Sequence, residues 1–194
     1  MRNKYGVLAL IATMVVVADQ LVKRWIVSFF GDVEGRTRPI ISGTFDLILT
    51  RNPGAAWGLL GDLRPDGLRI AVFVAISIAA VGIVLWSARR ARPEQRLLLV
   101  ALSLVLGGAL GNLVDRVAFG RVVDFLDFYT RAPWFMGLAE KVGRGCDVSL
   151  GCHWPAFNVA DICISTGVTL LVLESFIAPK AATAPVPDSP PAEA

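Results

Sequence analysis

The chain has 194 residues, of which 55% are hydrophobic and 18% are charged, and its formal net charge is +3. An ordinary soluble domain contains about 25% charged residues, whereas the mean hydropathy of this chain is +0.61. These values argue against a typical water-soluble globular protein. They predict one small polytopic membrane domain, and the sequence shows no internal repeat.

Four stretches are long and apolar enough to cross a bilayer as helices, which takes about 20 mostly apolar residues. They are residues 5–30, 68–87, 97–114 and 157–178. A cleaved signal peptide is the alternative for the first stretch, but its sequence continues well beyond the core of such a peptide. We therefore predict an all-α membrane protein with four transmembrane helices, in a single domain covering residues 1–178.

The distribution of basic residues predicts the orientation, because short loops rich in Lys and Arg stay in the cytoplasm. The connection between the second and third helices carries four arginines within residues 89–96. Basic residues also flank the first and last helices. Both termini are therefore expected in the cytoplasm, with residues 31–67 and 115–156 facing outward. The Pro- and Ala-rich tail, residues 179–194, is expected to be disordered.

The two outward segments contain more than linkers. Residues 38–52 and 120–130 hold β-branched and aromatic runs that are broken by Gly and Pro. Such runs are typical of short strands. We expect a small β-rich structure at the outer surface of the membrane.

Several polar residues are expected at one depth, near the outward ends of the helices. Asp19 lies some 14 residues into the first helix, which is about 21 Å along its axis. Lys23 follows four residues later, in the favourable acid-before-base order. The remaining members are Asn112, Asp115, Arg116, Asp124, Asn158 and Asp161. Since charged groups inside a membrane are costly, their convergence indicates a functional site.

Two adjacent carboxyl groups share one proton and supply an acid and a base together. Such a pair can activate water against a peptide bond without a metal or a covalent intermediate. Spacing alone does not identify which two acids form the pair; the candidates are Asp19, Asp115, Asp124 and Asp161. The competing interpretation, in which each acid pairs with a local base, is favoured for Asp115 because Arg116 adjoins it.

Three other functional classes fit the sequence less well. A transporter that relays protons would place acids at several depths, but here they gather on the outward side. A purely structural membrane subunit would explain the helices but not the five ordered sequence blocks given in the next paragraph. A zinc protease is disfavoured because the sequence has no HExxH motif and its only histidine is His153.

Five sequence blocks resemble those of bacterial lipoprotein signal peptidases (signal peptidase II) and occur in the same order. They are ADQLVKRW, RNPGAAWG, GGALGNLVDR, VVDFLDFY and FNVADICI. The resemblance implies a multi-pass aspartic endopeptidase of the bacterial inner membrane, with its active site near the periplasmic face. It also implies a β-rich cradle and a surface loop or helix. The implied substrate is a prolipoprotein whose cysteine carries diacylglyceryl, cleaved just before that cysteine.

Matched to these blocks, the catalytic pair falls on Asp124 and Asp161. Substrate-binding or supporting roles fall on Asp19, Lys23, Asn52, Gly54, Gly108, Asn112, Asp115, Arg116, Val122, Asn158 and Ala160. No cofactor, metal or nucleic-acid partner is expected. The partners implied are the prolipoprotein and membrane lipid, and we expect a monomer because one chain supplies the whole site.

The chain departs from the family in a long outward insertion at about residues 131–153. Cys146 and Cys152 lie in it, and an oxidising periplasm would permit a disulfide between them. Cys146, Cys152 and His153 are three candidate ligands in one short loop, but without a second pair they fall short of a usual zinc site. Cys163 in the last helix is expected to be a small apolar residue.

Overall fold

The computed structural model describes residues 4–54, 65–141, 146 and 151–177. Its long helices are α1 (Lys4–Phe29), α2 (Asp66–Arg90), α3 (Arg96–Phe119) and α5 (Val159–Ile177), and α4 (Pro133–Lys141) is short. The strands are β1 (Thr37–Ile41), β2 (Phe45–Asn52), β3 (Val122–Thr130) and β4 (Cys152–His153). The tail expected to be disordered, residues 179–194, lies outside the described residues.

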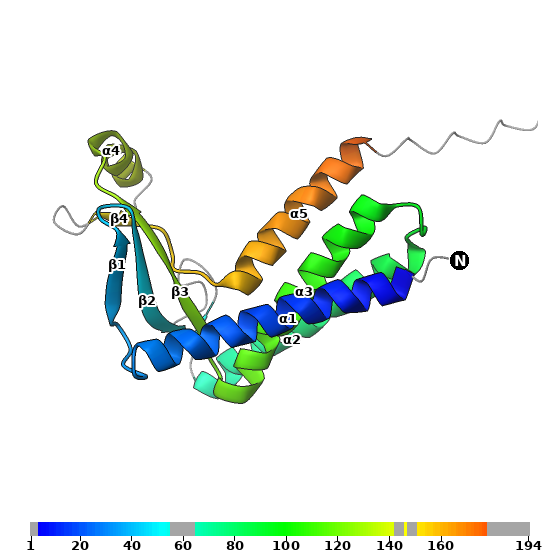
Figure 1. Cartoon of the computed structure of the whole chain (residues 1–194), viewed down its shortest axis with the longest axis horizontal. Helices are drawn as coiled ribbons and strands as arrows, with labels where there is room; N and C mark the ends of the chain where they lie inside the picture. Colours follow the sequence, from blue (N-terminus) through cyan, green and yellow to red (C-terminus); the bar gives the residue numbers. More distant parts are fainter. Residues whose placement is uncertain (1–3, 55–64, 142–145, 147–150, 178–194) are drawn as a thin grey trace, which may run out of the picture.

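The four long helices form a bundle that carries the sheet and α4 at one end (Figure 1). Each is long and apolar enough to span a membrane. The predicted fold class is therefore confirmed: four apolar helices with a small antiparallel sheet. The beginning of α1 and the connection between α2 and α3 lie at the other end of the bundle (Figure 1).

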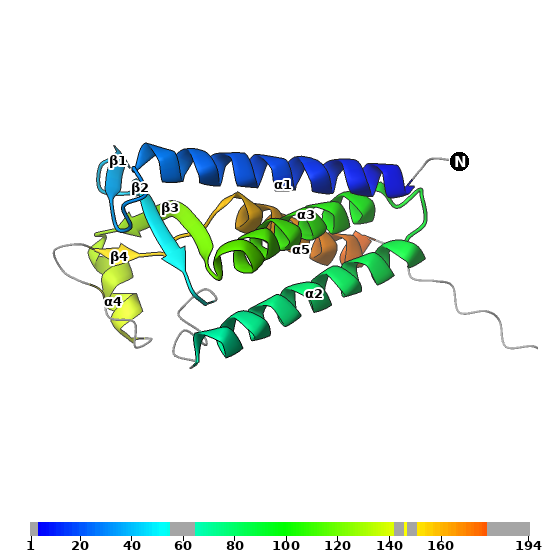
Figure 2. The ribbon, with the colours of Figure 1, turned by 90° about the horizontal axis from the view of Figure 1, so that it is seen from below.

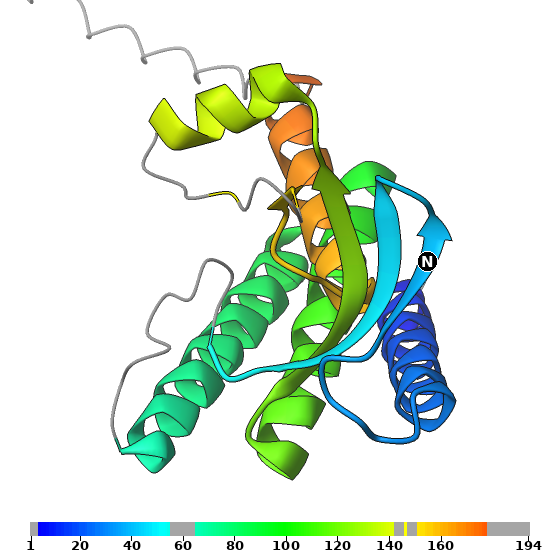
Figure 3. The same ribbon diagram turned by 90° about the vertical axis from the view of Figure 1, so that its left-hand side faces the viewer.

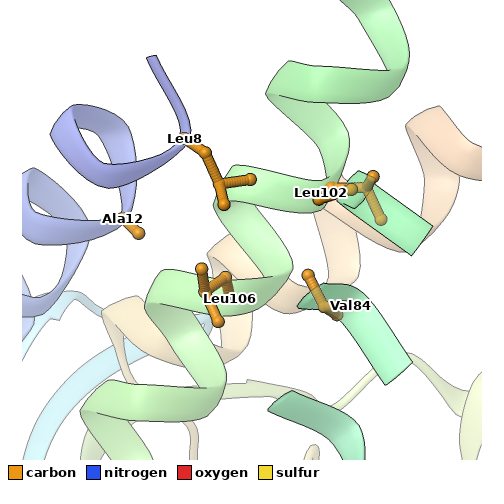
Figure 4. Close-up of a cluster of buried hydrophobic side chains, with 6 residues drawn as sticks. Leu8, Ala12, Val84, Leu102 and Leu106 are labelled. Atoms are coloured by element: carbon orange, nitrogen blue, oxygen red, sulfur yellow. The ribbon is translucent and has the colours of Figure 1, made fainter. Parts of the chain in front are cut away.

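Helix α3 lies at the centre of the bundle, between α1 and α2 (Figure 2). Leu8 and Ala12 of α1, Val84 and Ala88 of α2, and Leu102 and Leu106 of α3 form one buried cluster (Figure 4). The opposite face of α1 is apolar but exposed, with Leu10 and Leu21 more than 60% accessible. Hydrocarbon chains would cover that face in a bilayer.

Glycines let α3 approach its neighbours closely. A Cβ atom on Gly108 would lie 2.4 Å from the carbonyl oxygen of Ala160 in α5, and one on Gly107 would lie 2.6 Å from the Cβ of Val15 in α1. Small residues at such contacts are the usual means of packing membrane helices. The consequence is that polar side chains of α1, α3 and α5 can meet directly.

The strands form one antiparallel sheet in the order β1-β2-β3-β4, and they curve across the end of the bundle (Figure 3). Ile26 and Phe30 at the end of α1 pack against Leu49, Val123 and Phe125. This contact fixes the sheet on the bundle. The register pairs Thr50 with Asp124 and Asn52 with Val122.

The predicted element boundaries differ most for the third helix, which continues five residues past 114 to Phe119. Its last turns carry Asn112 and Asp115, whose side chains bond to other residues of the protein, and Arg116. Gly120 then ends the helix in the left-handed conformation, with φ +69°, which glycine adopts without steric cost. Strands β2 and β3 fall within the segments predicted to hold strands, and β1 begins one residue before the first of them.

Candidate active site

Asp124 lies in β3, where only 3% of its surface is accessible. The Nδ2 of Asn52, from the adjacent strand β2, donates a hydrogen bond of 3.0 Å to its Oδ2. The Nδ2 of Asn158 donates one of 2.7 Å to its Oδ1. Asn52 also accepts a bond of 2.9 Å from the backbone N–H of Gly54. Strand pairing and two amides therefore fix this carboxyl group.

Asp161 lies in the first turn of α5. Asn158, just before the helix, accepts the backbone N–H of Asp161 at 3.0 Å and donates its own N–H to the Asp161 carboxylate at 3.2 Å. This reciprocal pattern is a capping box, here in an Asn-x-x-Asp form. The Nδ2 of Asn112 donates to the other carboxylate oxygen at 2.8 Å. The helix start therefore sets the position of Asp161.

Asn158 joins the two acids. It is fully buried, and it bonds to Asp124 through its side chain and to Asp161 through its backbone and side chain. Its Nδ2 also lies 3.2 Å from the Oδ1 of Asn112. A single neutral residue thus holds both carboxyl groups in one hydrogen-bonded cluster.

A buried cation lies behind this cluster. The Lys23 Nζ is 2.8 Å from Asp19 Oδ2, 3.0 Å from Asp115 Oδ2 and 3.0 Å from Asn112 Oδ1. All three charged residues are almost inaccessible. A buried carboxylate is tolerated when it is paired and hydrogen-bonded, and Lys23 pairs with both acids.

The two acids bound to Lys23 each hold the backbone just before a member of the candidate pair. Asp19 accepts the N–H of Ala160 at 2.9 Å, and Asp115 accepts the N–H of Val123 at 3.1 Å. Ala160 precedes Asp161 and Val123 precedes Asp124 in the chain. The Lys23 cluster therefore ties α5 and β3 to α1 and α3.

Asp115 corrects one interpretation of the sequence. We expected it to pair with its neighbour Arg116, but its ionic partner is Lys23. Consecutive helical residues point in directions about 100° apart, so Asp115 faces α1. Arg116 instead lines the cavity described next, with its guanidinium 5.3 Å from the ring centre of Phe73.

Asp124 and Asp161 line a cavity of about 500 Å³. Five other predicted site residues line it too: Asn52, Gly54, Asn112, Arg116 and the apolar Val122. The rest of the wall comes from residues 154–157 and from the face of α5 that carries Ile162 and Thr166. Both carboxyl groups are therefore on the wall of one cavity.

The remaining predicted residues do not line this cavity. Asp19, Lys23, Asp115, Asn158 and Ala160 make hydrogen bonds or ion pairs behind it, and Gly108 packs α3 against α5. Cys146 and Cys152 form a disulfide away from the two acids, with Cα atoms 4.8 Å apart.

Burial raises the pKa of Asp124 from an ordinary value of 3.8 to about 7, and the negative charge of Asp161 adds to this effect. The hydrogen bonds from Asn52 and Asn158 and the charge of Lys23 act in the opposite direction. Asp124 therefore keeps a proton at pH values where a carboxyl group in water has lost it. The cluster can thus present an acid and a base together. Within the described part of the chain, no three His, Cys, Asp or Glu side chains are placed to hold a metal ion.

Residues 11–177 match the family model described as Signal peptidase (SPase) II. The chain belongs to the signal peptidase II family. The lipoprotein signal peptidase of Syntrophotalea carbinolica is 42% identical over 170 residues, covering 88% of this chain and 91% of the relative. The lipoprotein signal peptidase of Cupriavidus necator is 40% identical over 163 residues, covering 84% and 79%.

A solved bacterial membrane enzyme has a similar structure, with a TM-score of 0.69 and 27% identity over 90% of this chain and 95% of its own. Membership of the signal peptidase II family confirms the prediction of an aspartic peptidase of a bacterial membrane.

Gln20 and Trp154 are among the contributors to the site that the sequence did not predict. Gln20 donates a hydrogen bond of 2.8 Å from Nε2 to Asp115 Oδ1, and it follows Asp19 directly in the ADQLVKRW block. Trp154 lines the cavity. Its position shortly before the FNVAD block could have predicted that it lies near the site.

Proposed function

We propose that this protein is an intramembrane endopeptidase that removes signal peptides from diacylglyceryl-modified prolipoproteins. It cleaves just before the lipid-modified cysteine, and Asp124 and Asp161 activate the attacking water. The observation that carries the proposal is the placement of two buried acids, joined through Asn158, on the wall of one cavity. Curated relatives with about 40% identity are named lipoprotein signal peptidases, which supports the substrate class.

In the first step a water molecule lies between the two carboxyl groups and the scissile carbonyl carbon. The Asp161 carboxylate takes one proton from the water while its oxygen attacks that carbon. The protonated Asp124 gives its proton to the carbonyl oxygen. The product is a neutral tetrahedral diol, with Asp161 protonated and Asp124 ionised.

In the second step the diol collapses. Asp161 returns its proton to the amide nitrogen as the C–N bond breaks, and one hydroxyl of the diol gives its proton to Asp124. The signal peptide leaves with a new carboxyl terminus and the lipoprotein with a free amino group. Both acids regain their starting states, which is why no cofactor is required.

The proposed orientation places the sheet on the periplasmic side. Lys4 donates hydrogen bonds of 2.9 to 3.1 Å to the carbonyls of Ala88, Arg89 and Ala91, so the start of α1 lies beside the Arg-rich end of α2. Cytoplasmic loops are rich in Lys and Arg. The active site, at the sheet end, then lies near the periplasmic surface, where a signal peptide leaves the membrane.

The whole candidate site comes from one chain, because α1, α3, α5, β2 and β3 all contribute to it. This supports function as a monomer embedded in lipid.

Purified protein in detergent micelles would be given a synthetic prolipoprotein with and without the diacylglyceryl group. We expect mass spectrometry to find one cut, with the lipid-modified cysteine as the new N-terminus, and little cleavage of the unmodified peptide. Equal cleavage of both peptides, cleavage elsewhere, or no cleavage would contradict the proposal.

A further inference from the structure

Residues 152–157 begin at the end of the insertion, run antiparallel to β3 and are held to it at both ends. At one end, Cys152 pairs with Thr130 and His153 with Tyr129. At the other, Phe157 and Leu126 exchange backbone hydrogen bonds of 2.9 and 3.1 Å. Because Asn158 follows directly, this strip leads from the insertion into the polar cluster.

Trp154 lies in the middle of this strip and borders two cavities. One is the 500 Å³ cavity that holds Asp124 and Asp161. The other has a volume of about 180 Å³ and is lined by Tyr129, Phe135, His153 and other residues of the insertion and β3. Trp154, which is half exposed, therefore lies between the cavity that holds the two acids and the cavity beside the insertion.

Three contacts fix the residues just before and at Trp154. Cys152 is buried and bonded to Cys146. The Nδ1 of His153 lies 2.9 Å from both carboxylate oxygens of Asp127, which is itself buried, and the His153 ring stacks on Tyr129 with centroids 4.8 Å apart. The backbone N–H of Trp154 donates a hydrogen bond of 2.7 Å to the carbonyl oxygen of Phe128.

We propose that Trp154 is a specificity-determining residue that limits the size of the substrate side chain accepted beside the scissile bond. The disulfide and the contact between His153 and Asp127 act as positioning elements for its indole. The proposal rests on the proposed function, because it assumes that the catalytic cavity binds the prolipoprotein. A rigid aromatic wall excludes a large side chain by overlap and contacts a small one.

The test uses lipidated prolipoprotein peptides in which each position flanking the modified cysteine is changed in turn from Ala to Phe. The readout is the ratio of kcat/KM for the Ala peptide to that for the Phe peptide at each position. In Trp154→Ala we expect this ratio to fall by about tenfold or more at one position, a usual size for selectivity by an apolar pocket. In Trp154→Phe the ratio should fall less, because an aromatic wall remains.

Trp134→Ala is the matched control. Trp134 lies on α4, is 74% exposed and borders neither cavity. Its substitution removes the same side chain from the same side of the molecule, and the ratios should stay within about twofold of the unmutated protein.

The positioning elements are tested with Asp127→Asn and with the double substitution Cys146→Ser and Cys152→Ser. Each should shift the ratio in the same direction and at the same peptide position as Trp154→Ala, by a smaller factor. An unchanged ratio in both variants would overturn the positioning role.

The outcomes separate this inference from the proposed function. If the unmutated protein cleaves none of the peptides, the proposed function fails and the inference fails with it. If the unmutated protein cleaves them but Trp154→Ala leaves every ratio unchanged, the inference alone is overturned.

Discussion

At the scale of single residues, the site depends on neutralising charge within an apolar bundle. Lys23 contacts both Asp19 and Asp115, and each of these acids holds a backbone N–H next to a member of the candidate pair. The i, i+4 spacing in the sequence predicted the contact between Asp19 and Lys23. It did not predict Asp115 as the second partner, because that contact depends on how α1 packs against α3.

Replacing Lys23 by Met should strongly destabilise the protein. The substitution leaves two buried carboxylates without their cation, and breaking a buried ion pair in this way costs about 3–5 kcal/mol. The measurement is SDS-induced unfolding in mixed micelles. Arg51→Ala is the control, because Arg51 pairs with the exposed Asp32 and Glu34, and surface pairs contribute about 1 kcal/mol or less. Similar losses in both variants would contradict the role given to Lys23.

The pKa of Asp124, raised by burial to about 7, predicts how activity depends on pH. Asp124 gives a proton to the carbonyl oxygen, and a carboxyl group holds its proton below its pKa. Activity therefore requires a pH below about 7 and should fall about tenfold per pH unit well above it. A profile of kcat/KM from pH 5 to 9 provides the check. A rise in kcat/KM between pH 7 and pH 9 would show that Asp124 does not act as the acid.

At the scale of elements, α3 and α5 meet through a glycine. The hydrogen bond from Asn112 to Asp161 crosses this contact, so the spacing of the two helices controls the site. Hydropathy alone predicted all four long helices, because a bilayer imposes a minimum apolar length. It ended α3 five residues early, at 114 rather than at Phe119, because Asp115 and Arg116 look like loop residues until their contacts with other elements are known.

Gly108→Ala should reduce both stability and cleavage. The added Cβ would lie 2.4 Å from the Ala160 carbonyl oxygen and 2.7 Å from Ile164 Cγ1, so α5 must shift. Overpacking of this kind costs about 1–3 kcal/mol. The control is Gly82→Ala in α2, where nothing lies within 4 Å of the new Cβ and helix propensity favours Ala by about 1 kcal/mol. The measurements are the unfolding curves and the cleavage rates of the two variants, compared with the unmutated protein. An equal effect at both positions would refute a special packing role for Gly108.

At the scale of the whole molecule, the bundle separates a basic end from an end that carries the sheet (Figure 1). The basic residues between α2 and α3 predicted this polarity from the sequence. The path of the insertion could not be predicted in the same way. Strand pairing between β3 and β4 positions His153 against Asp127 and places Trp154 on the cavity wall. A strand of two residues is too short to give a recognisable sequence pattern.

The orientation in the membrane can be tested with single cysteines in a Cys163→Ser background. Ser42→Cys lies in the exposed turn between β1 and β2, and Glu94→Cys lies in the exposed connection between α2 and α3. A membrane-impermeant maleimide added to spheroplasts should label the first and spare the second until the membrane is opened. Labelling of the Glu94→Cys protein in intact spheroplasts would reverse the proposed orientation.

The central claim is that Asp124 and Asp161 perform the chemistry while Asp115 supports the structure. The most direct test compares cleavage of a diacylglyceryl-modified prolipoprotein by Asp124→Asn, Asp161→Asn and Asp115→Asn, each verified as folded in detergent. We expect the first two to lose at least about 100-fold in kcat, since each removes a proton-transfer group, and the third to keep partial activity. Full activity of folded Asp124→Asn or Asp161→Asn would contradict the assignment of the pair.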